Sequence, residues 1–141
     1  TCAMKDDMIA IYEKFRELDS LSVATPVMTM GIPGALKSFM DRFQVFFMAK
    51  YIRKRSLVPE SRRAHRRGLY LGISGMKVPN VFDGAKMTMK AFFSIIDVEY
   101  WDDLLISDMD TIQDLATRPD LLESAYRKGY EMGRLLVEGS S

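Results

Sequence analysis

The chain opens with apolar residues at helical spacing. They recur every three or four positions, as expected for one buried helix face, and they are Met8, Ile11, Tyr12, Phe15 and Leu18. Asp6 or Asp7 can accept a hydrogen bond from the free amides of the first turn, where negative charge is favourable. We therefore predict a helix that begins after Asp7 and ends near Asp19 and Ser20.

Three later segments show the same periodicity. A second helix is predicted from Pro33, which suits the first helical position, a third from Val81 to Ile96, and a last one from Pro119. The predicted inner face of the second helix is Leu36, Phe39, Met40, Phe43 and Phe47. That of the third is Phe82, Ala85, Met89, Phe92 and Phe93. That of the last is Leu122, Ala125, Tyr126, Gly129, Met132, Gly133 and Leu136.

Short β-prone runs separate the helices. The first is Leu21–Thr25, ended by Pro26 and followed by a loop to Ile32. The second, Leu69–Ser74, is almost wholly apolar, which is typical of a strand buried on both faces in a parallel sheet. A third strand region, Val98–Ser107, is expected to be interrupted at Asp102 and Asp103.

This alternation of helices and strands predicts an α/β fold with a parallel sheet and right-handed crossovers. The sequence shows no repeat, linker or low-complexity segment, so we expect residues 1–141 to form one domain. Three strands make a thin sheet for such a fold, and the chain opens on a helix where a strand would be usual.

Composition narrows the classes of partner. Of the 141 residues, 48% are hydrophobic and 28% charged, and 20 basic against 19 acidic side chains leave a net charge of +1. Such a balance gives no overall attraction to nucleic acid or to anionic membranes, and we expect neither as a partner. The single cysteine, Cys2, excludes an internal disulfide framework and a zinc site built from several cysteines. Together with the absence of a signal-peptide pattern, it predicts a cytoplasmic protein.

Charged segments offer weaker candidates for chemistry. Residues 50–67 carry eight basic side chains and one acid, Glu60. They could hold the 2′-phosphate of a nicotinamide cofactor or an RNA backbone, but Tyr51 is the only aromatic among them, so a solvated connection is favoured. His65 has no nucleophile motif nearby and is expected at the surface. Five acidic residues fit no calcium loop and are expected to face solvent: Asp102, Asp103, Asp108, Asp110 and Asp114.

Two loops that follow predicted strands are the strongest candidates for a site, because ligands of open parallel sheets bind at the carboxyl ends of the strands. One is Thr25, Pro26, Val27, Met28, Thr29, Met30 and Gly31, and the other is Ser74, Gly75, Met76 and Lys77. Small residues let main-chain groups approach a flat polar ligand, and methionine offers a soft surface to an aromatic ring. The loops therefore predict a site for a planar heterocycle, with plain connecting turns as the alternative. No glycine-rich phosphate loop of the usual spacings occurs.

The same residues resemble a known family. The eighteen residues from Thr25 to Arg42 look like the segment SPVYFGSVPAQLKAFIDR of the NADPH-dependent FMN reductase and iron–sulfur flavoprotein group. Cys2 followed by Lys5–Met8 is similar to that group's "C…KDDM" element. Gly72–Lys77 and Phe82–Ala85 resemble its later flavin-side loop and the helix that follows.

The resemblance implies a flavodoxin-like three-layer sandwich that binds FMN. The loop from Thr25 to Gly31 would edge the isoalloxazine ring, and Ser74–Lys77 would close over it from the neighbouring strand. The implied activity is electron transfer from NAD(P)H through FMN to a small acceptor, a quinone or a metal centre. Because the cofactor performs the chemistry, no residue is expected to act as an acid, base or nucleophile.

The sequence also departs from the family pattern. Family members begin with a strand, a phosphate-binding loop, a helix and a second strand, so this sheet would retain only strands 3, 4 and 5 of the order 2-1-3-4-5. Met28 stands where the family has a tyrosine, and an iron–sulfur cluster beside Cys2 would need cysteines upstream of this sequence. We expect the apolar edge at Leu21–Thr25 to pair with a longer polypeptide, another chain or a copy in a homo-oligomer. The alternative function is a flavin-free interaction module or subunit.

Overall fold

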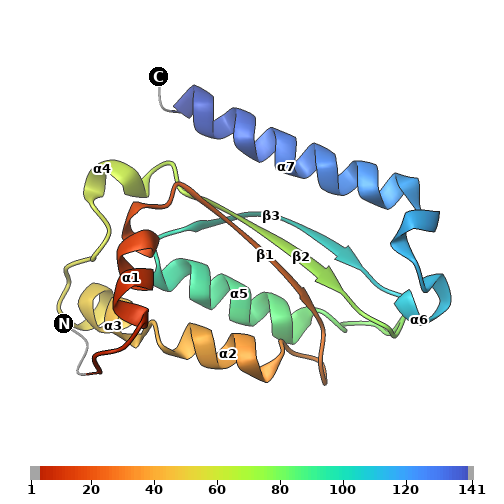
Figure 1. The fold of residues 1–141 in the computed structure, drawn as a ribbon, viewed down its shortest axis with the longest axis horizontal. Helices are drawn as coiled ribbons and strands as arrows, with labels where there is room; N and C mark the ends of the chain where they lie inside the picture. The colour runs from red at the N-terminus through yellow and green to blue at the C-terminus, as the bar shows by residue number, and fades with distance from the viewer. Residues whose placement is uncertain (1–3, 140–141) are drawn as a thin grey trace.

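The computed structural model describes residues 4–139, which form a parallel sheet with helices on both faces (Figure 1). The strands are β1 (Ser20–Pro26), β2 (Arg67–Ile73) and β3 (Glu99–Ile106), in the order β1-β2-β3. The apolar strand β2 is central, as its composition predicts. The predicted α/β class and parallel sheet are thus confirmed.

Helices cover the two faces unequally. One face carries α1 (Met8–Glu17), α2 (Gly34–Asp41), α3 (Gln44–Phe47), the π-helix η1 (Met48–Ile52) and α5 (Asp83–Ile95) (Figure 1). The other face carries α7 (Pro119–Gly139), which crosses above the sheet in the view of Figure 1. Three short pieces complete the described chain: α4 (Glu60–Arg63), α6 (Met109–Ile112) and the 3-10 helix η2 (Leu115–Thr117).

The strand register brings the three carboxyl ends level with one another. Pro26 lies opposite Ile73, and Ile73 lies opposite Ile106. The register between β2 and β3 shifts after Gly68, so that Trp101 is skipped. β3 is therefore continuous through Asp102 and Asp103, and the predicted interruption is instead a local irregularity one residue earlier.

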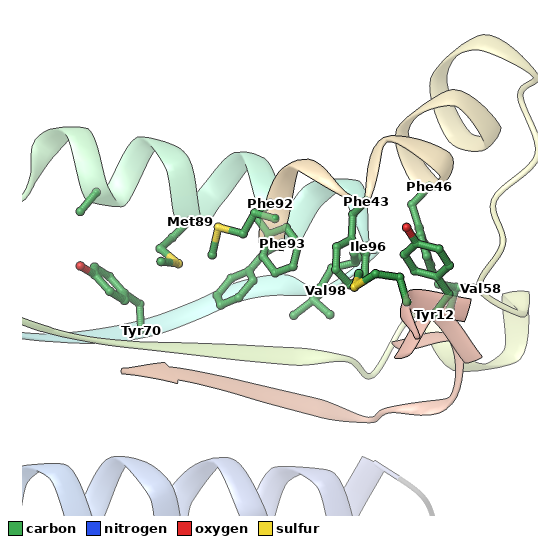
Figure 2. Packing of buried hydrophobic residues seen from close by; sticks show 13 residues of the cluster. Tyr12, Phe43, Phe46, Val58, Tyr70, Met89, Phe92, Phe93, Ile96 and Val98 are labelled. Carbon is green, nitrogen blue, oxygen red and sulfur yellow. The ribbon is translucent and has the colours of Figure 1, made fainter. Parts of the chain in front are cut away.

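Aromatic side chains fill the space between the sheet and the helices of the α5 face (Figure 2). The fully buried ring of Phe43 lies at their centre, 4.6 Å from the ring of Phe15 and 5.2 Å from that of Phe92 between centroids. The ring of Phe93 lies against β2 at Gly68, where an added Cβ would be 2.5 Å from a ring carbon. This contact explains a glycine inside the central strand, because any side chain would displace the ring.

The predicted second helix is broken, contrary to the continuous stripe from Leu36 to Phe47. α2 ends at Asp41, and the chain turns at Phe43 (φ −82°, ψ 15°) before α3 begins. The Tyr12 hydroxyl donates a 2.7 Å hydrogen bond to the carbonyl of Arg42, at the break between the two helices. Phe43 and Phe46 lie in the core, whereas Phe47 of the predicted stripe is only half-buried.

The predicted inner face of the last helix is partly wrong. Met132 is buried as expected, but the side chains of Leu122 and Tyr126 are 49% and 68% exposed. Lys128, which the apolar pattern leaves out, turns towards the sheet and pairs with Asp102 on β3. This ion pair and the packing of Met132 fix the rotation of α7 about its axis.

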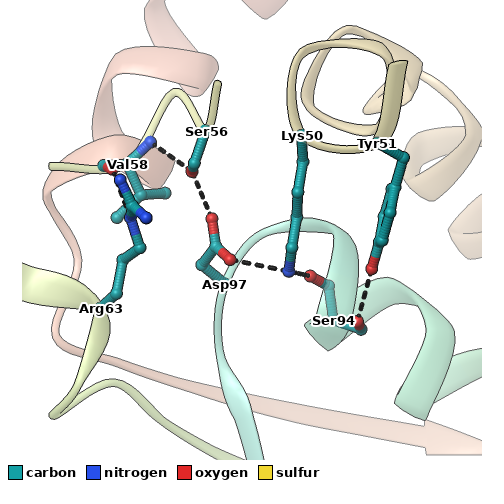
Figure 3. A network of polar contacts seen from close by, with 7 residues as sticks. All are labelled: Lys50, Tyr51, Ser56, Val58, Arg63, Ser94 and Asp97. Atoms are coloured by element: carbon teal, nitrogen blue, oxygen red, sulfur yellow. Dashed lines mark hydrogen bonds and ion pairs between the residues drawn. The ribbon is translucent and has the colours of Figure 1, made fainter. Parts of the chain in front are cut away.

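The basic segment, residues 50–67, leads into the amino end of β2. The two candidate loops lie at the other end, where the strands finish. Figure 3 shows that Lys50 pairs with Asp97 at 2.7 Å, and that Asp97 also accepts a hydrogen bond from Ser56. Arg66 is fully buried, and its Nη2 donates a 2.6 Å hydrogen bond to the carbonyl of Phe15 in α1. Burial lowers the pKa of Arg66. Most residues of the segment are exposed, as predicted for a solvated connection, and the segment lies at the other end of the strands from the candidate loops.

Three of the five acidic residues expected to face solvent are half-buried: Asp102, Asp103 and Asp108. Asp102 pairs with Lys128 of α7, and Asp103 pairs at 2.9 Å with Lys86 of α5. Being neighbours on one strand, these two carboxylates point to opposite faces of the sheet. Within residues 4–139, no helix is long and apolar enough to cross a membrane.

Candidate functional site

The two candidate loops leave neighbouring strands at the same edge of the sheet. The amide of Val27 donates a 2.8 Å hydrogen bond to the carbonyl of Ile73, and the amide of Ser74 donates one of 2.8 Å to Ile106. Thr25 and Ser74, at the roots of the two loops, are both buried. The parallel register therefore brings the two sequence-predicted segments side by side.

The first loop closes in a tight two-residue turn. The amide of Met28 donates to the carbonyl of Gly31 at 2.9 Å, and the amide of Gly31 donates back to Met28 at 3.0 Å. Between them, Thr29 and Met30 adopt positive φ values of 48° and 64°. Such φ values favour glycine or asparagine, and a β-branched residue there costs about 1–3 kcal/mol. Five other non-glycine residues of the described chain also have positive φ, so the turn is an indication of function only together with its place at the carboxyl ends of the strands.

Helix α5 holds this turn in place through a glycine. A Cβ added at Gly84 would lie 2.4 Å from the carbonyl oxygen of Met30, so the turn rests directly on the first turn of α5. The side chains of Met28 and Met30 remain substantially exposed on the outside. The turn is thus a fixed main-chain platform that carries two methionine side chains.

The second loop is tied to the segment that follows β3. The amide of Met109 donates to the carbonyl of Ser74 at 3.0 Å, and that of Asp110 donates to Gly75 at 3.1 Å. The carbonyls of Ser74 and Gly75 are therefore already hydrogen-bonded to the first residues of α6. The loop presents the exposed side chains of Met76 and Lys77 outwards, and the Nζ of Lys77 lies 3.8 Å from Asp108.

Several exposed apolar side chains gather at this edge. Met28, Met30, Met76 and Val78 are each more than two fifths exposed, and all four come from the two candidate loops or the residue after them. Thioether side chains adapt to the face of an aromatic ring. These side chains offer apolar surface to a planar heterocycle, beside the charged side chains of Lys77 and Asp108.

A cavity of about 350 Å³ opens at the same strand ends, but on the face that carries α7. Thr25 and Pro26 line it from β1, Ile73 from β2, Ile106 from β3 and Ala125 from α7. Residues 27–31 and 74–77 do not line this cavity. The structure therefore brings the two predicted loops together at the edge, without placing their methionines in this cavity.

A half-buried polar cluster between β3 and α5 was not predicted. The Tyr100 hydroxyl donates a 2.7 Å hydrogen bond to Asp103, which also pairs with Lys86. Burial and the bond to Asp103 raise the pKa of Tyr100 far above its ordinary value. Burial opposes ionisation of Asp103, but the hydrogen bonds from Tyr100 and Lys86 outweigh it and lower the pKa of this carboxyl.

Tyr70 on β2 belongs to the same region. Its hydroxyl is buried without a hydrogen-bond partner among the described residues, and burial raises its pKa. A Cβ at Gly72 would lie 2.8 Å from this hydroxyl, so the glycine makes room for the phenol. The sequence signal that could have indicated this buried hydroxyl is a tyrosine within a largely aliphatic strand.

Comparisons with known proteins agree with this architecture. Two iron–sulfur flavoproteins from Archaeoglobus fulgidus are similar to the chain. One is 36% identical over 50 residues, which are 36% of this chain and 26% of the relative. The other is 32% identical over 59 residues, 41% of this chain and 29% of the relative.

Solved structures show the flavodoxin-like fold. An FMN-dependent NADH-azoreductase from Bacillus anthracis in complex with FMN matches 92% of this chain and 61% of its own, with a TM-score of 0.59 and 18% identity. The Trp repressor binding protein from Bacillus subtilis matches 72% of this chain and 62% of its own, with a TM-score of 0.52 and 18% identity. At this identity the likeness concerns the fold alone.

The chain thus spans less than two thirds of each of these relatives. The family model of NADPH-dependent FMN reductases matches residues 1–76, which include α1, β1, the strained turn, α2 and the whole of β2. Taken with the parallel sheet and the paired loops at its carboxyl edge, this match shows that the chain belongs to the NADPH-dependent FMN reductase family.

Proposed function

We propose that this chain supplies the flavin-ring site of an FMN-dependent oxidoreductase that takes electrons from NAD(P)H. The observation that carries the proposal is the strained turn at Thr29 and Met30, held on Gly84 beside the Ser74–Lys77 loop. The acceptor in this proposal is a small molecule, a quinone or a metal centre. The related azoreductase, whose structure was solved with FMN, supports the same cofactor.

The residues at the edge fit the ring of FMN better than its phosphate. Met28, Met30 and Met76 offer soft apolar surface to one side of the isoalloxazine, and the turn fixes the main chain beneath it. When bound, FMN supplies hydride and single-electron chemistry. The role of this chain is to position the ring and to keep water from one of its faces.

The phosphate needs a different site. Within the described residues, no glycine-rich loop precedes a helix in the manner of a phosphate site. We therefore propose that tight FMN binding requires residues outside this chain, and that an iron–sulfur cluster would likewise need further cysteines. Cys2 lies outside the described residues. The proposal also includes one folded unit over residues 1–141 and a cytoplasmic location, which the single cysteine supports.

Quenching of flavin fluorescence tests the proposal, with riboflavin and FMN as separate probes. Because the ring alone is contacted, we expect both flavins to bind with similar dissociation constants. Gly84→Ala should weaken riboflavin binding by about tenfold, because the new methyl group displaces the carbonyl of Met30. Gly34→Ala is the matched control, since a Cβ at Gly34 meets nothing within 4 Å.

Three outcomes would contradict the proposed flavin-ring site. Absence of quenching by either flavin would contradict the ring site. FMN binding much more tightly than riboflavin would contradict the assignment of the phosphate to other residues. Equal affinity of Gly84→Ala and wild type would contradict the role of the turn, and thermal melts of both variants would separate binding from unfolding.

The second candidate is a flavin-free subunit. The exposed side chains of Leu122, Tyr126 and Tyr130 on α7 favour it, because such apolar surface is typical of a protein interface. It predicts a stable oligomer that binds no flavin and oxidises neither NADH nor NADPH with any acceptor.

A further inference from the structure

The basic segment, residues 50–67, takes no part in the proposed function. Of its eight cations, five are engaged within the chain by ion pairs or main-chain carbonyls: Lys50, Arg62, Arg63, Arg66 and Arg67. The other three are Arg53, Lys54 and Arg55, which we call the basic turn. Their side chains are exposed, and they form no ion pair with any residue from 4 to 139. These three positive charges are therefore available to an anionic partner.

The basic turn folds over the end of the π-helix η1. The amide of Arg55 donates a 2.9 Å hydrogen bond to the carbonyl of Ala49, across the last turn of the helix. Lys54, just before it, adopts a left-handed φ of 52°, a conformation that commonly ends helices. Positive charge is favourable at this end of a helix, because the last carbonyls carry partial negative charge. These contacts fix the main chain of the basic turn directly after Ile52, the last residue of η1.

Exposed apolar side chains adjoin the basic turn. Ile52 is 60% exposed, and Met48 is 44% exposed. The two are four residues apart on η1, about one turn of the helix, so they lie on one side of it. Capping accounts for cations at a helix end, but it does not account for an isoleucine left in water beside them. We call Met48, Ile52 and the basic turn together the amphipathic patch.

The amphipathic patch lies at one end of the molecule. It falls between α3 and α4, at the opposite end from α6 and the candidate loops (Figure 1). None of its residues lines the cavity between α1 and α3, and none lines the groove between α2 and α5. The patch is thus an outward-facing surface that presents both apolar and positively charged side chains.

We propose that the amphipathic patch binds the surface of an anionic membrane. Ile52 and Met48 enter the boundary between headgroups and acyl chains, and the basic turn lies against the negatively charged headgroups. The net charge of +1 over the whole chain gives no such attraction, but it conceals this local excess of cations. Each cation near an anionic surface strengthens binding about fivefold. Because the patch is short, the contact is weak and reversible.

The surroundings of the patch favour lipid over RNA or a peptide. The ring of Tyr51 packs 5.0 Å from that of Phe47 between centroids, and its hydroxyl is hydrogen-bonded to Ser94 at 2.8 Å (Figure 3). This ring is therefore not free to stack on a base, and RNA phosphates would leave Ile52 in water. A peptide partner needs pockets for its anchoring side chains, and the patch does not line the neighbouring cavities. A flat anionic surface takes up cations and apolar side chains together.

Membrane binding through this patch leaves the candidate ring site open. The loops after β1 and β2 lie at the far end of the strands, so they face away from the lipid surface (Figure 1). The two sites occupy different ends of the molecule, and membrane binding does not depend on flavin binding.

Co-sedimentation with lipid vesicles tests the proposal. We expect the chain to bind vesicles in which about a third of the lipid is phosphatidylserine, and not vesicles of phosphatidylcholine alone. Arg53→Gln, Lys54→Gln and Arg55→Gln together should weaken binding about a hundredfold. Added salt should also weaken it, because it screens the attraction to the headgroups.

A second triple variant is the matched control. It removes the same total charge from exposed positions on α2, α5 and α7, by Lys37→Gln, Lys90→Gln and Arg127→Gln. Binding should then weaken by less than about threefold, because these cations lie outside the patch. Circular dichroism checks that both triple variants are folded.

The apolar part of the patch has its own test. Ile52→Gln should weaken vesicle binding about tenfold, because it removes the side chain that enters the lipid. Met87→Gln, at a position of α5 that is 72% exposed, is the control and should leave binding unchanged. In a Cys2→Ser background, Ile52→Cys carrying an environment-sensitive fluorophore should shift its emission to shorter wavelength on anionic vesicles, whereas labelled Met87→Cys should not.

Several results would overturn the proposal. These are the absence of binding to phosphatidylserine vesicles, equal losses in the two triple variants, and equal spectral shifts at the two labelled positions. Binding of polyuridylate or polyglutamate in place of vesicles would assign the patch to RNA or to an acidic protein, and would overturn it as well.

Discussion

The two faces of the sheet are built from alternate residues of the same strands, yet they are packed very differently. Towards α5, the rings of Phe43, Phe92 and Phe93 fill the interior, and α1, α2 and α5 together enclose them (Figure 2). Towards α7, a cavity of about 350 Å³ remains beside a single helix. The difference lies in the number of helices covering each face, because the strands supply apolar residues to both.

The largest expected effect concerns the aromatic cluster. Phe43→Ala should lower the free energy of unfolding by about 3–5 kcal/mol, because five neighbouring rings cannot collapse into the space left behind. Leu122→Ala on α7 should cost less than about 1 kcal/mol, because that side chain is half exposed. Urea unfolding at one fixed protein concentration measures both. Equal losses would mean that the two faces contribute equally to stability.

Replacing an alanine by a larger residue should be harmful on the α5 face and tolerated on the α7 face. Ala85→Leu on α5 should destabilise by about 1–3 kcal/mol, because Ala85 is fully buried against the sheet. Ala125→Leu on α7 should be neutral or stabilise by about 0.5–1 kcal/mol, because Ala125 lines the cavity. Thermal melts compare the two variants. A loss for Ala125→Leu as large as that for Ala85→Leu would show that the cavity closes in solution.

The smallest expected difference between the two faces concerns the neighbouring carboxylates of Asp102 and Asp103. Asp103→Asn removes the charged partner of Lys86 and leaves only a neutral amide oxygen to accept from the Tyr100 hydroxyl, and should cost about 1–2 kcal/mol at neutral pH. Asp102→Asn, facing α7, removes only the pair with Lys128 and should cost about 0.5 kcal/mol.

The two aspartates should also differ with pH. The pKa of Asp103 is lower in the folded protein than its ordinary value of 3.8, so the stability it contributes is present above that value. It is lost as the pH falls through the lowered pKa. The difference in unfolding free energy between wild type and Asp103→Asn should therefore shrink below about pH 4, as followed by urea titrations at several pH values. A difference that stayed constant down to strongly acidic pH would contradict this cause.

The elements with one dominant apolar pattern could be predicted from the sequence. The central strand and α5 lie within about two residues of their expected bounds, because periodicity reports local burial directly. The break at Phe43 could not be predicted. It coincides with a hydrogen bond from Tyr12 to the carbonyl of Arg42, thirty residues apart in the chain. The rotation of α7 was also missed, because it follows from the pairing of Lys128 with Asp102 on another element.

The candidate site was also predictable only in part. The loops after β1 and β2 could be located because parallel strands end at one edge. The strained turn could not be predicted, since Thr29 and Met30 are poor residues for positive φ and the turn packs against Gly84 of α5. That contact joins residues more than fifty positions apart, which no local pattern contains.

Arg66 links the helix that opens the described chain to the strand at its centre. Its guanidinium donates to the carbonyl of Phe15, fifty-one residues earlier, so α1 gains this partner only once the start of β2 is in place. Contacts of such sequence separation form late, because a long loop must close first. Docking of α1 should accordingly be among the last events of folding, with its amides protected from hydrogen exchange after those of β2.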